Sequence, residues 1–279
     1  MAIPFELLGA RIGPVVISVP HAGRNYPTDI QSKLAVPLIK ATALEDRYVD
    51  ILITHAVTRG HRAIVARTPR LLIDLNRAET DFEPATIAGG QHRAARPSHR
   101  ARGGLGLVPD RLGDVNQLWR DPLDAAALAE RIVTVHRAYH HMLGDLMEEA
   151  HARFGVAILI DLHSMPALPG PRPAEIVIGD LCGRSASSGY VDAAHAVFED
   201  RGLRVARNAP YAGGHILERH TRPAAGYHGV QIEVDRRLYL DSALDGPGDG
   251  QSRLRQVICN LADSLTNYAA STRLPIAAE

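Results

Sequence analysis

The sequence has few of the features that stabilise secreted proteins or anchor membrane proteins. Among 279 residues only Cys182 and Cys259 are cysteines, too few for a disulfide framework, and we expect both to be buried free thiols. No apolar run approaches the roughly 18 residues of a membrane-spanning helix. Met1–Ala10 lacks the charged and apolar regions of a signal peptide. These absences predict a cytoplasmic protein with no membrane partner.

The sequence also lacks a net charge. Lys and Arg number 31, as do Asp and Glu, so no overall field attracts nucleic acid or an anionic membrane. We therefore expect no nucleic-acid partner, and any preference for an acidic small molecule must come from local charge. No Pro/Ser-rich linker or charge run divides the chain, which is 46% hydrophobic. We expect a single domain over 1–279 with its core over about 11–273.

Several catalytic motifs are missing as well. There is no Gly-x-Ser-x-Gly nucleophile elbow. The glycines of 103–106 have no strand directly before them and no clear helix after them, which excludes a dinucleotide fingerprint. His136, His140 and His141 fall in a long predicted helix, where we expect surface or packing roles rather than metal binding.

The sequence does contain an alternation of strand-like and helix-like segments. Apolar runs with β-branched residues predict strands over 15–19, 63–66, 71–74, 156–161, 175–179, 203–206 and 229–234. Helical spacing predicts helices over 44–59, 122–154 with a break at Gly144, 188–201 and 251–271. This alternation predicts an α/β fold with a mixed, mainly parallel central sheet flanked by helices. The long, weakly periodic segment 80–114 is expected to be a lid or a wall of the site.

Polar side chains follow several of the predicted strands, at the sheet edge where α/β proteins bind ligands. His21 and His163 can supply two neutral nitrogens to a catalytic zinc ion, which takes three protein ligands and leaves a position for water. The third ligand would be Glu45 or Asp46. Neighbouring helical residues point about 100° apart, so only one of these carboxylates would face the metal, and spacing alone does not choose. The alternative for His163 is a hydrogen-bonded core histidine.

Glu233 and several arginines supply the other groups that amide hydrolysis needs. Zinc lowers the pKa of its bound water toward roughly 7. Glu233, a carboxylate in an apolar strand, can take the water proton and pass it to the leaving nitrogen. A structural salt bridge is its alternative role. Arg77 can grip a substrate carboxylate with Asn76 beside it, and Arg102 can make a second anion contact. The alternative for Arg77 is an ordinary surface ion pair.

Six ordered segments, spanning about 16–241, resemble the N-formylglutamate amidohydrolases. They are Val19-Pro20-His21-Ala22-Gly23, Glu45-Asp46-Arg47-Tyr48-Val49-Asp50, Asp74-Leu75-Asn76-Arg77, Asp161-Leu162-His163-Ser164, Pro210-Tyr211-Ala212-Gly213-Gly214-His215 and Val230-Gln231-Ile232-Glu233. The resemblance implies a fold similar to the zinc carboxypeptidases. It implies one zinc ion per chain, held by His21, Asp46 and His163. It also implies that Glu233 is the general base.

The same resemblance implies the activity: hydrolysis of N-formyl-L-glutamate, a small anionic substrate, to formate and L-glutamate in histidine degradation. Asn76 and Arg77 look like the pair with which carboxypeptidases hold a terminal carboxylate. His215, at the end of one motif, joins Arg102 as a predicted substrate-binding residue. The segment 80–114 matches the family only in patches, which leaves the acyl group and the side chain open. The alternatives are deacylation of another N-acyl amino acid, trimming of a small peptide, or a non-catalytic binding protein of the same fold.

Overall fold

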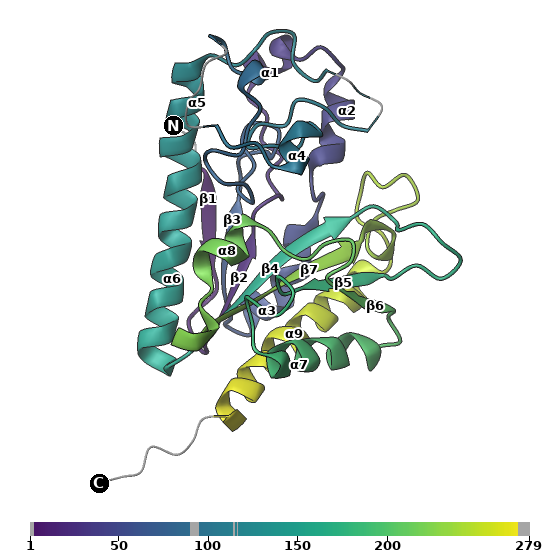
Figure 1. The fold of residues 1–279 in the computed structure, drawn as a ribbon. Helices are drawn as coiled ribbons and strands as arrows, with labels where there is room; N and C mark the ends of the chain where they lie inside the picture. The colour runs from purple at the N-terminus through teal and green to yellow at the C-terminus, as the bar shows by residue number, and fades with distance from the viewer. Residues whose placement is uncertain (1–2, 90–94, 114, 116, 273–279) are drawn as a thin grey trace.

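The computed structural model describes residues 3–89, 95–113, 115 and 117–272, which form one sheet with helices around it (Figure 1). The strands are β1 (Phe5–Leu8), β2 (Val15–Val19), β3 (Arg62–Ala66), β4 (Ala157–Met165), β5 (Ile176–Gly179), β6 (Val205–Arg207) and β7 (Tyr227–Asp235). Their order in the sheet is β1-β3-β2-β4-β7-β5-β6. β1 and β3 pair antiparallel, as do β5 and β7, and the other neighbours are parallel. The prediction of a mixed, mainly parallel sheet is confirmed.

Helices of very different lengths connect the strands. The α-helices are α1 (Thr28–Lys33), α2 (Leu38–Ala41), α3 (Thr54–Thr58), α4 (His99–Arg102), α5 (Ala125–Arg131), α6 (Ala138–Phe154), α7 (Ser188–Glu199), α8 (His215–His220) and α9 (Gln251–Thr272). Short 3-10 turns include η1 (Thr42–Leu44) and η2 (Val49–Ile53). Among the described residues, no helix has both the length and the apolar character needed to cross a membrane.

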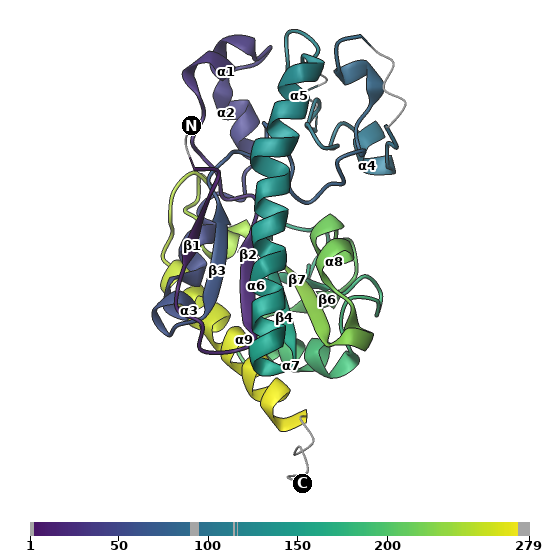
Figure 2. The same cartoon turned by 90° about the vertical axis from the view of Figure 1, so that its left-hand side faces the viewer.

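Helices cover both faces of the sheet because its central strands are apolar on both faces. Val15, Ile17 and Val19 of β2 belong to one hydrophobic cluster, which includes residues of α7 and α9. Val16 points to the opposite face, into the cluster formed with α6 and α8. All nine residues of β4 are buried. Figure 2 shows α6 running along one face of the sheet, with α9 behind it on the other.

A region of short helices and loops lies beyond one end of the sheet (Figure 1). It contains α1, α2 and α4, and it has apolar clusters of its own, one around Leu34 and Leu71 and another around Ile73 and Leu107. Most of the segment 80–114 belongs to this region, although 90–94 and 114 lie outside the described residues. We call this region the cap.

Some expected elements do not form as predicted. The segment 71–74 is a turn rather than a strand, and the Asp74 amide donates to the Leu107 carbonyl oxygen in the cap at 2.7 Å instead of to a neighbouring strand. The edge strand β1 was not predicted, and it adds antiparallel to β3. Cys259 is buried as expected, but Cys182 is exposed.

The predicted helix over 44–59 is interrupted. Tyr48 has a left-handed backbone with φ of 56°, and it separates the turn η1 from η2 and α3. The pair Glu45-Asp46 therefore lies in an irregular turn between η1 and η2. The 100° rule for neighbouring helical side chains does not apply to this pair.

The long predicted helix over 122–154 forms as α5, a π-helical turn (Ile132–Arg137) and α6 in succession. Its N-cap is Asp124, whose side chain accepts hydrogen bonds from two backbone amides of the first turn. The expected break at Gly144 is absent, since α6 continues through it. Gly155 ends α6 with φ of 66°, as predicted.

Alanine substitutions at Gly144 and Gly155 should have opposite effects on the free energy of unfolding. A Cβ added at Gly144 would meet only His220 Cε1, at 3.9 Å. Because alanine is favoured over glycine inside a helix by about 0.8–1 kcal/mol, Gly144→Ala should raise the free energy of unfolding by about 0.5–1 kcal/mol. Gly155→Ala should lower it by about 1–2 kcal/mol, because its left-handed conformation strains a side chain. Urea unfolding followed by circular dichroism measures both, and a destabilised Gly144→Ala would contradict an unstrained α6.

Candidate metal centre

Two neighbouring strands bring His163 and Glu233 together. β4 and β7 pair in parallel, with Asp161 opposite Gln231 and His163 opposite Glu233. Because side chains alternate along a strand, these four polar side chains lie on one face near the carboxyl ends of both strands. A histidine and a carboxylate 70 positions apart in the sequence therefore become direct neighbours.

His21 and Asp46 reach the same place from the other side of β4. His21 follows β2, which is the parallel neighbour of β4. The backbone amide of Asp46 donates to the carbonyl oxygen of His21 at 3.0 Å, which ties the two segments together. Glu45 points elsewhere, where it accepts hydrogen bonds from Tyr26 Oη at 2.7 Å and from Arg47 at 3.1 Å. Of the two adjacent carboxylates, only Asp46 faces the histidines.

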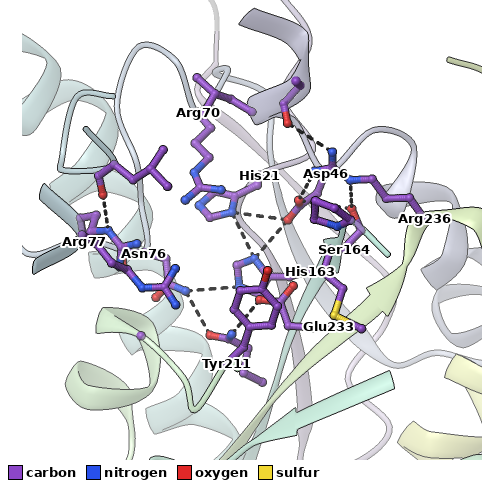
Figure 3. A pocket seen from close by; sticks show the side chains of 18 of the residues that line it. His21, Asp46, Arg70, Asn76, Arg77, His163, Ser164, Tyr211, Glu233 and Arg236 are labelled. Atoms are coloured by element: carbon purple, nitrogen blue, oxygen red, sulfur yellow. Dashed lines mark hydrogen bonds and ion pairs between the residues drawn. The ribbon is translucent and has the colours of Figure 1, made fainter. Parts of the chain in front are cut away.

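Three ligand-type atoms meet at this point (Figure 3). Asp46 Oδ2 lies 3.2 Å from His163 Nδ1 and 3.4 Å from His21 Nδ1, and the two Nδ1 atoms are 3.1 Å apart. All three side chains are buried. Ligand atoms at zinc distances of about 2.0–2.2 Å lie roughly 3.3–3.6 Å from one another in a tetrahedron. The triangle therefore has nearly the size of one face of a zinc tetrahedron.

Buried carboxylates fix the orientation of both imidazoles. His21 Nε2 donates to Asp74 Oδ1 at 2.7 Å, and His163 Nε2 donates to Asp161 Oδ2 at 2.8 Å. With the Nε2 atoms protonated, both Nδ1 lone pairs and an oxygen of Asp46 face one point. Three acceptors in that arrangement repel one another unless a cation lies between them. Histidines that bind metals commonly donate their second nitrogen to a carboxylate in this way, so the donor set fits a divalent transition metal.

The pKa values of the cluster also indicate a preference for positive charge. Burial alone would raise the pKa of the Asp46 carboxyl, but hydrogen bonds and charge from His163 and His21 outweigh it and hold that pKa well below its usual range. Burial likewise lowers the pKa of His163, but the Asp161 and Asp46 carboxylates outweigh it and raise that pKa well above its usual value. Without a metal, the cluster holds a proton on an imidazole, in the place that suits a cation.

Glu233 faces the same cavity but has a different environment. Burial raises the pKa of Glu233 to about 7. The positive charge of His163 lowers this pKa, and the negative charge of Asp46 raises it. Its Oε1 accepts a hydrogen bond from Gln231 Nε2 at 2.9 Å. Within the described residues it forms no ion pair with an arginine, so the salt-bridge alternative does not describe this side chain. A carboxyl group with a pKa near 7 is suited to exchanging protons at neutral pH.

A cavity of about 190 Å³ opens beside the cluster, between the sheet and the cap. Pockets for drug-sized ligands measure roughly 300–1,000 Å³, so this cavity suits a smaller molecule. Besides the cluster and Glu233, its lining includes the phenol ring of Tyr211 and the guanidinium groups of Arg70, Arg77, Arg100 and Arg236. These cations make the cavity suitable for an anion, although the whole chain has no net charge.

Asn76 and Arg77 both line this cavity, in different ways. Arg77 is held by a hydrogen bond from its Nε to the Leu105 carbonyl oxygen of the cap at 2.9 Å. The Asn76 amide is committed to the protein: its Oδ1 accepts from the Ile216 amide at 2.9 Å, and its Nδ2 donates to Gln231 Oε1 at 3.2 Å. Asn76 therefore connects α8 to β7, while Arg77 presents charge to the cavity.

The other two predicted substrate-binding residues lie outside the cavity. Arg102 is exposed at the end of α4, whereas Arg100 on the same helix lines the cavity. Within the described residues, the Arg100 guanidinium has no hydrogen bond or ion pair, and its contact is with the Tyr211 ring, 5.7 Å from the ring centre. His215 begins α8 and packs against other histidines away from the metal cluster.

Sequence reasoning missed several residues that surround the cluster. Arg236 donates to Asp46 Oδ1 at 3.3 Å. Arg70 donates to Oδ2 of Asp74, the carboxylate that also binds His21, at 2.8 Å. Neither arginine stands in a recognisable spacing, so no local signal marks them. Asp161 did carry a signal, because residues two apart in a strand share a face and His163 is its partner.

The chain is similar to known proteins over most of its length. A model of the family described as N-formylglutamate amidohydrolase matches residues 13–240. The chain is 28% identical over 277 residues to an N-formylglutamate deformylase of Pseudomonas aeruginosa, covering 93% of this chain and 96% of that protein. It is 26% identical to the Pseudomonas putida protein of the same name over 235 residues, 82% of each chain.

A solved structure is similar over nearly the whole fold. The crystal structure of the N-formylglutamate amidohydrolase from Ralstonia eutropha JMP134 matches with a TM-score of 0.90 at 30% identity, covering 97% of this chain and 100% of that chain.

The raised pKa of Glu233 predicts a pH effect on the stability of the metal-free protein. Its pKa is about 7 in the folded state and 4.5 in the unfolded state, so folding favours the protonated form. This contribution is complete below pH 4.5 and disappears as the pH rises through 7. Relative to Glu233→Gln, the wild type should lose on the order of 1.4 kcal/mol per pH unit across that window. Urea unfolding of both proteins, after metal is removed with a chelator, measures the difference in their free energies of unfolding. A difference that does not change with pH would contradict the raised pKa.

Proposed function

The chain belongs to the N-formylglutamate amidohydrolase family, and from that premise we propose that it hydrolyses N-formyl-L-glutamate to formate and L-glutamate. One observation carries the proposal: His21, Asp46 and His163 converge beside Glu233 in a small cavity lined by guanidinium groups. The names of its relatives support the choice of substrate. The proposed cofactor is one catalytic Zn²⁺ per chain, since two imidazoles and a carboxylate are typical ligands of a catalytic zinc.

Glu233 is the proposed general base and acid. When bound, zinc would polarise the formyl carbonyl group and make a coordinated water more acidic. Glu233 accepts the proton of the attacking water as the new C–O bond forms. It then delivers this proton to the amide nitrogen as the C–N bond breaks, so that L-glutamate leaves as the amine. The hydrogen bond from Gln231 holds one carboxyl oxygen in place during both transfers.

In this proposal each of three arginines interacts with a different negatively charged group of the reacting substrate. Arg70 is half-buried, and it shares the Asp74 carboxylate with His21; its guanidinium can stabilise the charge that develops on the formyl oxygen. Arg77 binds the α-carboxylate, for which a planar guanidinium is well suited. Arg100, whose guanidinium has no ion pair within the described residues, binds the side-chain carboxylate.

Free rather than disulfide-bonded cysteines support a cytoplasmic location.

Formate release from N-formyl-L-glutamate tests the reaction and the metal together. Purified protein should release formate, lose this activity on treatment with a chelator, and regain it when Zn²⁺ is added. An inactive protein with a full equivalent of bound metal would contradict the proposed substrate, and other N-acyl amino acids would then be assayed. Activity that persists after complete removal of metal would contradict the proposed cofactor.

Glu233→Gln is the matched control for the chemical step. The amide has the same shape and keeps an oxygen to accept from Gln231, but it cannot take up a proton at neutral pH. We expect kcat to fall by roughly 10²–10⁴-fold, with bound zinc and KM nearly unchanged. A variant with near-normal kcat would remove Glu233 from the mechanism.

Arg100→Gln and Arg102→Gln distinguish the two arginines of α4. If Arg100 binds the side-chain carboxylate, Arg100→Gln should lower kcat/KM for N-formyl-L-glutamate by about 10–100-fold, the range expected for a charged hydrogen bond. The value for N-formyl-L-glutamine, which lacks that charge, should change little. Arg102→Gln should leave both values within about twofold of the wild type, because its side chain is exposed outside the cavity. The reverse pattern would assign the contact to Arg102.

A further inference from the structure

We propose that His136, His140 and His215 form a second metal site, for a late first-row divalent cation such as Zn²⁺ or Cu²⁺, behind the segment 75–77. One nitrogen from each of the three rings can be chosen so that these atoms all lie within 4.8 Å of one another. The site shares no residue with the cluster of His21, and nothing in the proposed reaction requires it.

The first two ligands come from one helix. His136 and His140 are four residues apart, a spacing that places two side chains on the same helical face. Their exposed fractions are 0% and 1%, so of the surface and packing roles that the sequence suggested only packing fits these two rings. His136 lies in the π-helical turn before α6. Such turns are rare, and they frequently mark functional sites.

His136 and His140 each donate one hydrogen bond to the backbone, which leaves the second ring nitrogen of each with a lone pair. His136 Nε2 donates to the Arg77 carbonyl oxygen at 2.8 Å, and His140 Nε2 donates to the Leu75 carbonyl oxygen at 2.9 Å. Both Nδ1 atoms therefore carry lone pairs, as in metal-bound imidazoles with a backbone outer partner. His136 Nδ1 and His215 Nε2 are buried without a hydrogen-bond partner among the described residues. A coordinated cation would satisfy both.

His220 provides access to the site and a fourth imidazole. Its Nε2 donates to His140 Nδ1 at 2.9 Å, a bond that coordination at this nitrogen would replace. Both rings line a cavity of about 370 Å³, through which a cation can reach them. The nitrogen spacing of up to 4.8 Å is wider than the 3.1–3.4 Å of the first cluster, so small ring rotations must accompany binding. We therefore expect the second cation to bind more weakly.

The charge of the site selects the class of cation. Burial lowers the pKa of all three rings, to about 4 for His215, so they are neutral and able to coordinate at pH 7. Neutral imidazoles suit Zn²⁺, Cu²⁺ and Ni²⁺ rather than Mg²⁺ or Ca²⁺. The Glu79 carboxylate lies 3.7 Å from His136 Nδ1, where it can balance part of the charge of the cation.

The second site would connect α6 and α8 to the segment that carries Arg77. The backbone on both sides of Asn76 already accepts hydrogen bonds from the two histidines of the long helix. The Ile216 amide, next to His215, donates to Asn76 Oδ1 at 2.9 Å. A cation joining these elements would stabilise the wall of the substrate cavity without taking part in the reaction.

Metal stoichiometry tests the proposal. The full chain is stripped with a chelator and dialysed against increasing free Zn²⁺, and bound zinc is counted by mass spectrometry. We expect two ions per wild-type chain, the second at higher free Zn²⁺, and one ion in His136→Gln, whose side-chain amide can still donate to the Arg77 carbonyl oxygen. A wild-type chain that saturates at one ion overturns the proposal.

His141→Gln is the matched control, because His141 is exposed and its ring lies 3.0 Å from Asp145 on the same helix. It should keep both ions. If this variant loses the second ion while His136→Gln keeps it, the ion is bound at the surface and the proposal is overturned.

Electron paramagnetic resonance of Cu²⁺ bound to Asp46→Asn gives an answer that does not depend on His136→Gln folding. Because His21 and His163 remain in that variant, the spectrum is also recorded for the same protein with His21→Gln and His163→Gln added. In this variant the bound Cu²⁺ should still show coupling to several imidazole nitrogens, and a spectrum without such coupling overturns the proposal. Neither experiment uses a substrate, so failure of the proposed reaction would not affect the result.

Discussion

Two buried hydrogen bonds determine the charge at the centre of this molecule. His21 and His163 each donate their Nε2 proton to an aspartate, and their remaining lone pairs then face an oxygen of Asp46. A cluster of three acceptors is unfavourable in a protein interior unless a cation is present. The surrounding structure maintains this arrangement: Arg236 and Ser164 donate to the other oxygen of Asp46, so that Asp46 Oδ2 remains directed at the histidines.

The sheet gives this cluster its reactive neighbour. Parallel pairing of β4 and β7 sets His163 directly beside Glu233, and a shift of one residue would turn Glu233 to the opposite face. The same pairing gives the two carboxylates different properties. Asp46 is surrounded by imidazoles and stays ionised, whereas Glu233 is buried with fewer compensating charges and has a pKa of about 7. One carboxylate is thus suited to binding a cation, and the other to exchanging a proton.

The cavity between the sheet and the cap carries a local excess of positive charge. The chain has no net charge, yet four guanidinium groups line a cavity of about 190 Å³. Local placement of charge therefore replaces an overall field as the source of attraction for an anion. The segment 75–77 lies between this cavity and the second group of histidines. Asn76 and the carbonyl groups on either side of it make hydrogen bonds to α8 and to the two histidines of the long helix. A movement of these helices would therefore displace the residues that line the cavity.

The sequence by itself determined the α/β class, the order of most strands and helices, and the roles expected of His21, His163 and Glu233. These features are local: hydrophobic periodicity marks each element, and a polar residue at the end of an apolar strand has a predictable position. Tertiary structure decided which of the two adjacent carboxylates faces the histidines. The left-handed Tyr48 breaks the expected helix and turns Glu45 toward Tyr26.

Tertiary structure also decided that Arg100 lines the cavity while Arg102 does not, and that Arg70 and Arg236 belong to the site. It brought together the histidines of α6 and α8, which are separated by more than 70 residues in the sequence. Residue spacing specifies the direction of a side chain within its own element. It does not specify which distant elements will pack against each other, because that depends on how the whole chain buries its apolar surface.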